Sequence, residues 1–254
     1  MTLHVRQLVK HFGGVQAVKG VGFEVNPGEC VALIGPNGAG KSTTFACIAG
    51  QHALTQGEVR WAGQRIDRLA PAQRQKLGVA RTFQVAQTFE ALTVMQNLQL
   101  IQAAPRGLRS WNRLATSAVD AALARLAQVG LRNLAQSDAM DLPYGAKKRL
   151  ELAIALAGLP ADGPRLLLLD EPAAGLAATE RAELMALIQS LAAQGVAVLY
   201  TEHNMDAVFG VADRVLVLID GLLAAQGTPA EVAGDATVRS RYLGRGFQAE
   251  GAHA

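Results

Sequence analysis

A glycine-rich segment with a lysine and two hydroxyls, GPNGAGKST, runs from Gly35 to Thr43. It matches the pattern G-x-x-x-x-G-K-[ST] and lies between the apolar run Val31 to Ile34 and the helix-like stretch TFACIAG, which is the strand, loop and helix context that the pattern requires. The segment is therefore predicted to cradle the phosphates of a nucleoside triphosphate. A glycine-rich turn that contains Lys-Ser by chance is the alternative, and the flanking strand and helix argue against it.

Each residue type in this loop has a physical task. Gly35, Gly38 and Gly40 permit backbone conformations and close approaches that a Cβ would obstruct, so successive N–H groups can converge on phosphate oxygens. Lys41 would bring a positive charge to the β- and γ-phosphates, and the Ser42 hydroxyl could ligate Mg²⁺. The helix that starts there presents its positive end to the anion. The expected nucleotide-binding residues of the loop are Gly35, Pro36, Asn37, Gly38, Ala39, Gly40, Lys41, Ser42 and Thr43.

Two adjacent carboxylates end a second apolar run, RLLLLDEP, from Arg165 to Pro172. Asp170, at the predicted strand end, is expected to hold Mg²⁺ through its water shell. Glu171 is expected to orient or deprotonate the attacking water. Taken alone, an apolar strand ending in Asp-Glu is equally typical of a solvated strand end, but a phosphate loop in the same chain favours the catalytic interpretation.

Short apolar runs are predicted to form the strands that position these groups. They are Val31 to Ile34, Leu166 to Leu169, Val196 to Tyr200 and Val215 to Ile219. Helical-period stretches separate several of them, and this alternation predicts an α/β fold with a mostly parallel sheet. Between about 89 and 159 the chain is rich in Ala, Leu, Gln and Arg without a convincing strand, so a helical lobe is predicted there, inserted between core segments of about 1–88 and 160–235.

Length and composition bound the organisation of the chain. Its 254 residues, half of them hydrophobic, suffice for one domain, which is expected over 1–246 with a frayed tail at 247–254. Lys and Arg number 24 against 21 Asp and Glu, a net charge of +3 with interspersed signs, so no nucleic-acid partner is expected. Cys30 and Cys47 lie in apolar stretches without metal or disulfide spacing and are expected to be reduced core residues.

No targeting or membrane-spanning segment is predicted. The N-terminal stretch is interrupted by His4, Arg6, Lys10 and His11, so it lacks the continuous apolar segment of a signal peptide. The longest strongly apolar runs fall far short of the ~20 residues that cross a bilayer as a helix. A role in a membrane process would therefore be performed from outside the lipid.

A phosphate loop with an Asp-Glu pair indicates only the P-loop nucleoside triphosphatases, which include kinases, helicases and GTPases. Further motifs resemble the ATP-binding cassette (ABC) family across nearly the whole chain, in that family's order. RTFQ, Arg81 to Gln84, resembles its Q-loop, and YTEHN, Tyr200 to Asn204, resembles its switch-histidine segment. Phe12 lies where the family places an aromatic ring that stacks on adenine; packing in the core is the alternative for this side chain.

The resemblance implies a P-loop NTPase (RecA-like) core with a small antiparallel β region, binding ATP and Mg²⁺. It implies that Gln84 contacts Mg²⁺ and the attacking water, beside the contact with the membrane subunits, and that His203 touches the γ-phosphate. The catalytic residues expected on this basis are Lys41, Gln84, Glu171 and His203, and the metal-site residues are Ser42, Gln84 and Asp170. The residues Phe89, Leu92 and Met95 are candidates for the membrane-subunit contact, or else pack within the lobe itself.

Two segments depart from the family pattern. LPYGA, Leu142 to Ala146, stands where the family's signature Leu-Ser-Gly-Gly-Gln is expected, and Pro143 has neither a hydroxyl nor an N–H to offer, although it suits the first turn of a helix. AGLA, Ala174 to Ala177, replaces Ser-Ala-Leu-Asp in the D-loop. In this family both surfaces act on the nucleotide held by the other subunit. Either the chain pairs with a different cassette and the two ATP sites are unequal, or backbone donors suffice in this branch.

FGGVQAVKGVGFEV, LTVMQNL, QGTPAEV and RYLG most resemble cassette subunits of importers for branched-chain (hydrophobic) amino acids. Similar subunits serve urea and amide uptake, and a more distant relative drives lipopolysaccharide export. The implied partners are a second cassette, identical or different, two transmembrane permease subunits and a separate solute-binding protein. The implied location is peripheral, at the cytoplasmic face of the inner (plasma) membrane.

Two other classes remain open from the sequence. A soluble ABC ATPase of DNA repair or translation usually carries two cassettes or a long coiled-coil insertion, and this chain has neither. A small-molecule P-loop kinase would leave LPYGA and YTEHN unexplained.

Overall fold

The computed structural model describes residues 1–82, 88–103, 119–160 and 162–244. Its centre is a six-stranded sheet in the order β10-β9-β3-β8-β7-β6, where β10 alone is antiparallel to its neighbour. The bounds of its strands are β3 Cys30–Ile34, β6 Val79–Arg81, β7 Leu166–Asp170, β8 Ala197–Thr201, β9 Arg214–Ile219 and β10 Leu222–Gly227. The predicted α/β fold with a mostly parallel sheet is confirmed.

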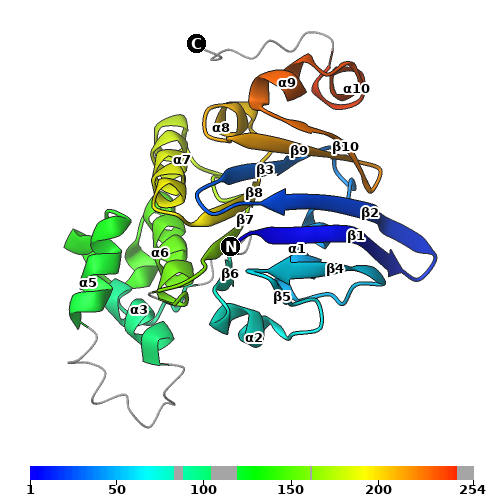
Figure 1. Cartoon of the computed structure of the whole chain (residues 1–254). Coiled ribbons are helices and arrows are strands. Elements are labelled where there is room, and N and C mark those ends of the chain that lie inside the picture. The colour runs from blue at the N-terminus through cyan, green and yellow to red at the C-terminus, as the bar shows by residue number, and fades with distance from the viewer. Residues whose placement is uncertain (83–87, 104–118, 161, 245–254) are drawn as a thin grey trace.

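A four-stranded antiparallel sheet lies beside the central one (Figure 1), in the order β2-β1-β4-β5. Its strands are β1 Leu3–Phe12, β2 Val15–Val25, β4 Gln56–Trp61 and β5 Gln64–Arg65. Helix α1, Lys41–Ala49, packs between the two sheets, because Phe45 and Ile48 share a buried cluster with Leu33 of β3 and Leu3 of β1. This packing fixes the start of α1 at the end of β3. The four-stranded sheet itself confirms the predicted antiparallel region.

Helices cover the opposite face of the central sheet. Between β6 and β7 the described chain forms α3 Val94–Ala103, α5 Val119–Gln128 and α6 Tyr144–Ala157, which group at one side of the molecule (Figure 1). Ala32 and Ile34 of β3 point to this face, so β3 is apolar on both sides, as expected of a central parallel strand. The other α-helices of the described residues are α2 Pro71–Lys76, α7 Ala178–Ala193, α8 Met205–Phe209, α9 Pro229–Gly234 and α10 Ala236–Val238.

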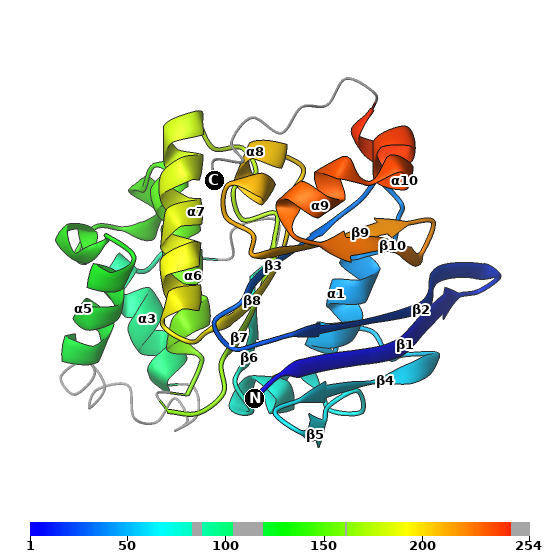
Figure 2. The ribbon, with the colours of Figure 1, turned by 45° about the horizontal axis from the view of Figure 1, so that its top comes forward.

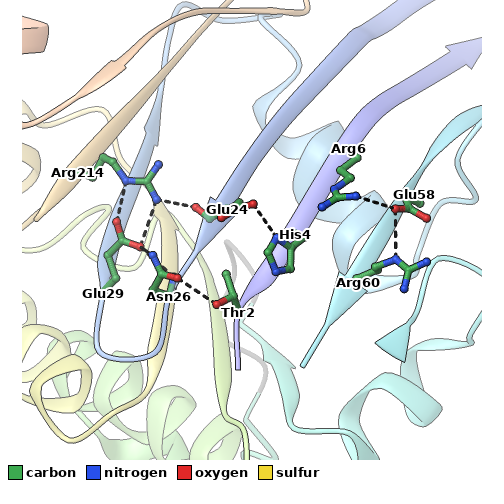
Figure 3. Close-up of polar contacts among 9 residues, drawn as sticks. All are labelled: Thr2, His4, Arg6, Glu24, Asn26, Glu29, Glu58, Arg60 and Arg214. Atoms are coloured by element: carbon green, nitrogen blue, oxygen red, sulfur yellow. Dashed lines mark hydrogen bonds and ion pairs between the residues drawn. The ribbon is translucent and has the colours of Figure 1, made fainter. Parts of the chain in front are cut away.

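A polar network ties the two sheets together at the start of β3 (Figure 3). Arg214 of β9 donates two hydrogen bonds to Glu29, at 2.7 Å and 3.2 Å, and a third to the backbone oxygen of Glu24 at 2.6 Å. Asn26 donates its backbone N–H to Glu29 at 2.9 Å. The carboxylate of Glu29 therefore links β9 to the turn between β2 and β3.

Both cysteines lie in the core, as predicted. Cys30 and Cys47 are fully buried and form no disulfide. Burial raises the pKa of the Cys30 thiol to about 12 and that of Cys47 to about 11, so both are protonated at neutral pH. Among the described residues, no helix is both long enough and apolar enough to cross a bilayer.

Candidate functional site

The phosphate-loop sequence folds into a tight turn between β3 and α1 that admits only glycine at two positions. Gly35 has a φ of +146°, and a Cβ there would lie 2.0 Å from the backbone oxygen of Leu218. Gly40 has a φ of +99°, and a Cβ there would lie 2.6 Å from the backbone oxygen of Ala17 in β2. Neighbouring backbone thus closes on both ends of the loop, which explains these two glycines.

Lys41 is the first residue of α1 and is 7% exposed. Its ammonium donates to the backbone oxygens of Gly35 at 2.7 Å and Pro36 at 3.1 Å, across the mouth of the loop. Burial lowers the pKa of this lysine, and the carboxylates of Glu171 and Asp170 oppose that shift. The three charged groups predicted from separate parts of the sequence therefore lie together.

The rest of the loop is open to solvent where an anion would approach. Asn37, Gly38 and Ser42 are exposed, Pro36, Gly40 and Thr43 are half-buried, and Ala39 is buried. The first turn of α1 holds no acidic residue, so nothing on that turn offsets the positive end of the helix. This arrangement suits the binding of a phosphate chain.

Asp170 ends β7 and accepts two hydrogen bonds that hold its carboxylate in place. Thr201, opposite it on β8, donates its hydroxyl to Oδ1 at 2.9 Å. Arg81, at the end of β6, donates Nη2 to Oδ2 at 2.7 Å. Only 8% of Asp170 is exposed, so its charge is held by these partners instead of by bulk water.

Glu171 has a φ of +49°, which is uncommon for a residue with a side chain. Its backbone N–H donates to the Thr201 hydroxyl at 3.0 Å, and its carbonyl accepts from Ala174. The side chain reaches His203, with Oε1 2.8 Å from Nε2. A strained backbone that the surroundings hold in one conformation is typical of functional sites, and here it presents the carboxylate to the histidine.

The donor set around Asp170 fits Mg²⁺. That ion takes one or two protein oxygens and completes its shell with water and substrate phosphates. Asp170 supplies a carboxylate beside Lys41, Ser42 supplies an exposed hydroxyl on the next residue, and no described group of three or more His, Cys, Asp or Glu forms an all-protein cage. The predicted metal residue Gln84 lies outside the described residues.

Phe12 is not a core residue. Its ring is 43% exposed at the end of β1, where it meets the ring of His52 edge to face at a centroid distance of 5.2 Å. The ammonium of Lys10 lies 4.8 Å from the centre of the Phe12 ring. The core-packing alternative for Phe12 is therefore wrong, and the ring is available for stacking.

The two segments that depart from the family pattern lie against each other. Pro143 occupies the N-cap position of α6, one residue before the first turn where it was expected. Tyr144 is 47% exposed and covers Gly175, where a Cβ would lie 3.2 Å from the tyrosine ring. A Cβ on Gly145 would lie 2.6 Å from Glu180 in α7. The residues 142–146 and 174–177 thus form one continuous surface.

The three residues considered for a membrane-subunit contact differ in their exposure to solvent. Phe89 is 48% exposed, whereas Leu92 and Met95 are half-buried and Met95 packs against the core. Phe89 lines a cavity of about 620 Å³ between the core and the helices that follow β6. Other residues on its wall are Pro71, Ala72, Arg81, Ile101 and Ile154.

Three polar residues of the site were missed by reasoning from the sequence. Arg81 and Thr201 hold Asp170, and Glu202 accepts the backbone N–H of Ala173 at 2.8 Å, directly after the catalytic segment. Burial raises the pKa of Glu202, and backbone N–H groups oppose this effect. All three lie inside or beside RTFQ and YTEHN, so their closeness to Gln84 and His203 was the available signal.

Known proteins match this chain over nearly its full length. The family described as ABC transporter matches residues 18–174. The high-affinity branched-chain amino acid transport ATP-binding protein LivG of Escherichia coli is 38% identical over 95% of this chain and 97% of its own. The corresponding protein BraF of Pseudomonas aeruginosa is 36% identical over the same shares.

Solved structures agree with the sequence relatives. The crystal structure of MJ1267, an ATP-binding cassette of an ABC transporter in its ADP conformation, superposes with a TM-score of 0.84 at 30% identity, covering 96% of this chain and 99% of that one. A nucleotide-free ATP-binding cassette from an ABC transporter gives 0.83 at 29% identity, covering 96% and 100%. With a phosphate loop, an Asp-Glu pair and a histidine assembled at the sheet's edge, the chain belongs to the ABC transporter family as an ATP-binding and ATP-hydrolysing cassette.

Proposed function

We propose that this chain energises an ABC importer of branched-chain or other hydrophobic amino acids. The observation that carries the proposal is the 2.8 Å contact between Glu171 and His203, beside Lys41 and Asp170, in a chain that resembles LivG and BraF from end to end. Urea and amide importers and lipopolysaccharide exporters are the alternative systems for the same cassette. The similarity to two proteins named for branched-chain amino acid transport favours the first.

Each site residue has a role in this proposal. Lys41 leaves its loop carbonyls for the β- and γ-phosphates, and the N–H groups of residues 35–43 surround the anion. Ser42 and Asp170, with Gln84, hold Mg²⁺, which would neutralise charge on the phosphates. Glu171 orients or deprotonates the attacking water, and His203 holds Glu171 and contacts the γ-phosphate. Phe12 stacks on the adenine ring.

The cavity beside Phe89 is the proposed contact with the permease subunits. Its wall is largely apolar, with Pro71 and Ala72 from α2 facing Ile101 and Ile154 from α3 and α6. An apolar hollow between two helical groups suits an inserted helix of a membrane subunit. A charge at this wall, Ala72→Glu, is expected to abolish recovery of the membrane subunits, whereas Lys76→Glu, an exposed change on the same helix, should retain it.

A second cassette is proposed to complete the ATP site. Tyr144, Gly175 and Pro143 lie on one surface, and that surface would face the nucleotide of the partner. If a different cassette is the partner, the two ATP sites are unequal. Pro143→Ser should then raise the rate of ATP hydrolysis at the site that this surface closes. If backbone donors suffice, Pro143→Ser should change the rate by less than about twofold.

The experiment that tests the function is recovery of the subunit from its native membrane with and without Glu171→Gln. Recovery with two multi-span proteins, a second cassette and a solute-binding protein, and uptake of radiolabelled leucine that is lost in the variant, would support the importer. We expect phosphate release to fall by on the order of 100-fold or more while ATP binding persists. Uptake of urea instead of leucine would show that the transported substrate is a different one. Recovery of the subunit bound to ribosomes or DNA would contradict the proposed transport function. Phosphorylation of an added small molecule would indicate a kinase.

A further inference from the structure

Two neighbouring strands of the central sheet, β7 and β8, lead to the side chains that face each other in the candidate site. They run parallel, and Asp170 at the end of β7 pairs in register with Thr201 at the end of β8. The chain continues from β7 into a turn that carries Glu171, and from β8 into a short segment that carries His203. Figure 2 shows the helices that follow, α7 and α8, side by side, and these helices contact each other. The 2.8 Å contact between Glu171 and His203 therefore depends on how two separate connections are held.

Glu202 bonds to both of these connections. It follows Thr201 directly and is only 3% exposed. Its Oε1 accepts the backbone N–H of Ala173 at 2.8 Å, in the turn after β7. Its Oε2 accepts the backbone N–H of His203 at 3.2 Å, in the segment after β8. One buried carboxylate thus bridges the turn of Glu171 to the backbone of His203, with one oxygen for each.

Anchored backbone borders this bridge on both sides. Before it, the Thr201 hydroxyl accepts the N–H of Glu171 at 3.0 Å and fixes the start of the turn. After it, Asn204 is the N-cap of α8, where its side chain accepts a backbone N–H of the first helical turn at 2.9 Å. His203 lies between the anchored strand and the anchored helix, and its side chain is 46% exposed. Glu202 adds, at the backbone of His203, a direct tie to the turn of Glu171.

The chemistry of a carboxylate suits this bridge. When ionised it accepts hydrogen bonds at both oxygens and donates none, and a buried carboxylate needs such donors to offset the cost of leaving water. The amide of a glutamine would turn its NH₂ group toward one of the two backbone N–H groups and leave that N–H without an acceptor. The substitution Glu202→Gln therefore opens one side of the bridge while keeping the size of the side chain.

We propose that Glu202 is a positioning residue for ATP hydrolysis, whose bridge sets the separation between Glu171 and His203 at which the carboxylate acts on the attacking water. This inference rests on the proposed roles of Glu171 and His203. Glu202 acts through them, because it is buried and its contacts are with backbone N–H groups. A misplacement of a reacting group by about 1 Å can lower a rate by about 100-fold, so a tie of this kind matters to turnover.

The alternative is that Glu202 only stabilises this edge of the sheet. Its loss would then lower the thermal midpoint and leave the turnover of the folded protein unchanged. Glu29→Gln is the matched control, because the Glu29 side chain is also largely buried, at 15% exposed, and also accepts a backbone N–H, from Asn26 at 2.9 Å. It lies directly before β3, away from Glu171 and His203, so its loss should affect stability alone.

The test measures steady-state phosphate release by the full chain, in the complex recovered from its native membrane, together with the thermal midpoint. The rate that remains in Glu171→Gln is subtracted, because it belongs to any other ATPase in the preparation. We expect Glu202→Gln to lower kcat by about 10- to 100-fold and to change KM by less than about 3-fold. Glu29→Gln should keep kcat within about 2-fold. If Glu202→Gln does not fold, Glu202→Asp replaces it with the same expected result, because its carboxylate is one methylene too short to reach both N–H groups.

Hydrogen exchange over residues 171–177 reports the turn itself in the same variants. Exchange there should rise in Glu202→Gln and stay unchanged in Glu29→Gln. A lower thermal midpoint in Glu202→Gln with unchanged kcat would assign Glu202 to stability alone. A fall in kcat without faster exchange in the turn would also refute the positioning role, because the bridge would then not be what holds the turn.

Glu171→Gln in this assay separates the inference from the proposed function. If Glu171→Gln releases phosphate as the natural chain does, Glu171 is not the catalytic carboxylate, and both ideas fall. If Glu171→Gln loses phosphate release but Glu202→Gln keeps its kcat, the proposed site stands and the positioning role of Glu202 is refuted. Loss of turnover in both variants, with KM and the Glu29→Gln control unchanged, is the result that the bridge predicts.

Discussion

Arg81 and Asp170 are 89 residues apart in sequence, yet Nη2 of the arginine lies 2.7 Å from Oδ2 of the aspartate. They end two parallel strands, β6 and β7, that are hydrogen-bonded neighbours. The same guanidinium donates to Gln51, just after α1, and lies 6.0 Å from the Phe45 ring. Arg81 therefore connects the carboxylate proposed for Mg²⁺ to the helix that starts at the phosphate loop and to the segment that contains Gln84.

Replacing Arg81 by Gln should leave a buried carboxylate without its charged partner. The two side chains are only 12% and 11% exposed, so we expect a loss of about 3 kcal/mol in the free energy of unfolding, measured with urea. Arg60→Gln breaks a pair with Glu58 that is 42% and 22% exposed and should cost less than about 1 kcal/mol. Adding Asp170→Asn to Arg81→Gln should recover part of the loss. Equal losses in Arg81→Gln and Arg60→Gln would contradict this account.

Replacing His203 by Ala should separate catalysis from binding. The histidine contacts Glu171 at 2.8 Å, and its loss should lower kcat for ATP by on the order of 100-fold, since a correctly held base contributes 10²–10⁴. KM should change little. His4→Gln is the control, because His4 pairs with Glu24 on the antiparallel sheet and should leave kcat within about twofold. A large rise in KM at constant kcat would give His203 a binding role instead.

Replacing Glu29 by Gln should weaken the fold in a pH-dependent way. Burial raises the pKa of Glu29, but the hydrogen bonds from Arg214 and Asn26 outweigh it and hold the pKa below its ordinary value of 4.5. A lowered folded pKa means that the stabilisation is present above about pH 4.5 and is lost as the pH falls through the folded value. We expect Glu29→Gln to lose about 1–3 kcal/mol in urea unfolding at pH 7 and less at pH 3.5.

The control for this pH dependence is Glu24→Gln, because the Glu24 side chain is 55% exposed and its ion pair in Figure 3 is with His4. It should cost less than about 0.5 kcal/mol at either pH. A loss in Glu29→Gln that grows as the pH falls would have the wrong sign and would refute the proposed network.

Replacing Arg74 by Met should destabilise the chain without touching the site. This arginine is 2% exposed and donates to four backbone oxygens, including Cys47 at 2.7 Å and Ile48 at 2.6 Å near the C-terminal end of α1. These carbonyls would be left buried without donors, at a cost of about 3 kcal/mol or more in urea unfolding. Lys76→Met, an exposed change on the same helix, should stay within about 0.5 kcal/mol. Similar losses in both variants would exclude this role for Arg74.

Four of the six strands of the central sheet could be predicted within a residue of their observed ends, whereas β6 and β10 were not predicted. The run Val31 to Ile34 appears as Cys30–Ile34, and Leu166 to Leu169 appears as Leu166–Asp170. Val196 to Tyr200 is displaced by one residue to Ala197–Thr201. Each is apolar on both faces because helices and the second sheet cover it, so composition alone marks its limits.

The antiparallel strands could not be bounded in the same way. β1 and β2 carry Lys, His and Gln on their exposed faces, and their pairing changes register between Val5 and Leu8 and again beyond, which interrupts the alternation that a strand would show. The residues that hold Asp170 could not be predicted from the sequence for another reason. Arg81 and Thr201 act on a residue far away in the chain, and only the strand order of the central sheet brings them to Asp170.

The helices α3, α5 and α6 leave the central sheet after β6 and return at β7, and these two strands are paired directly to each other. The hydrogen bonds between β6 and β7 do not involve the inserted helices. In evolution, such an insertion can lengthen, shorten or be exchanged while Asp170 and Glu171 keep their places at the end of β7. Recognition of new partners and the chemistry of ATP can therefore diverge separately within this one fold.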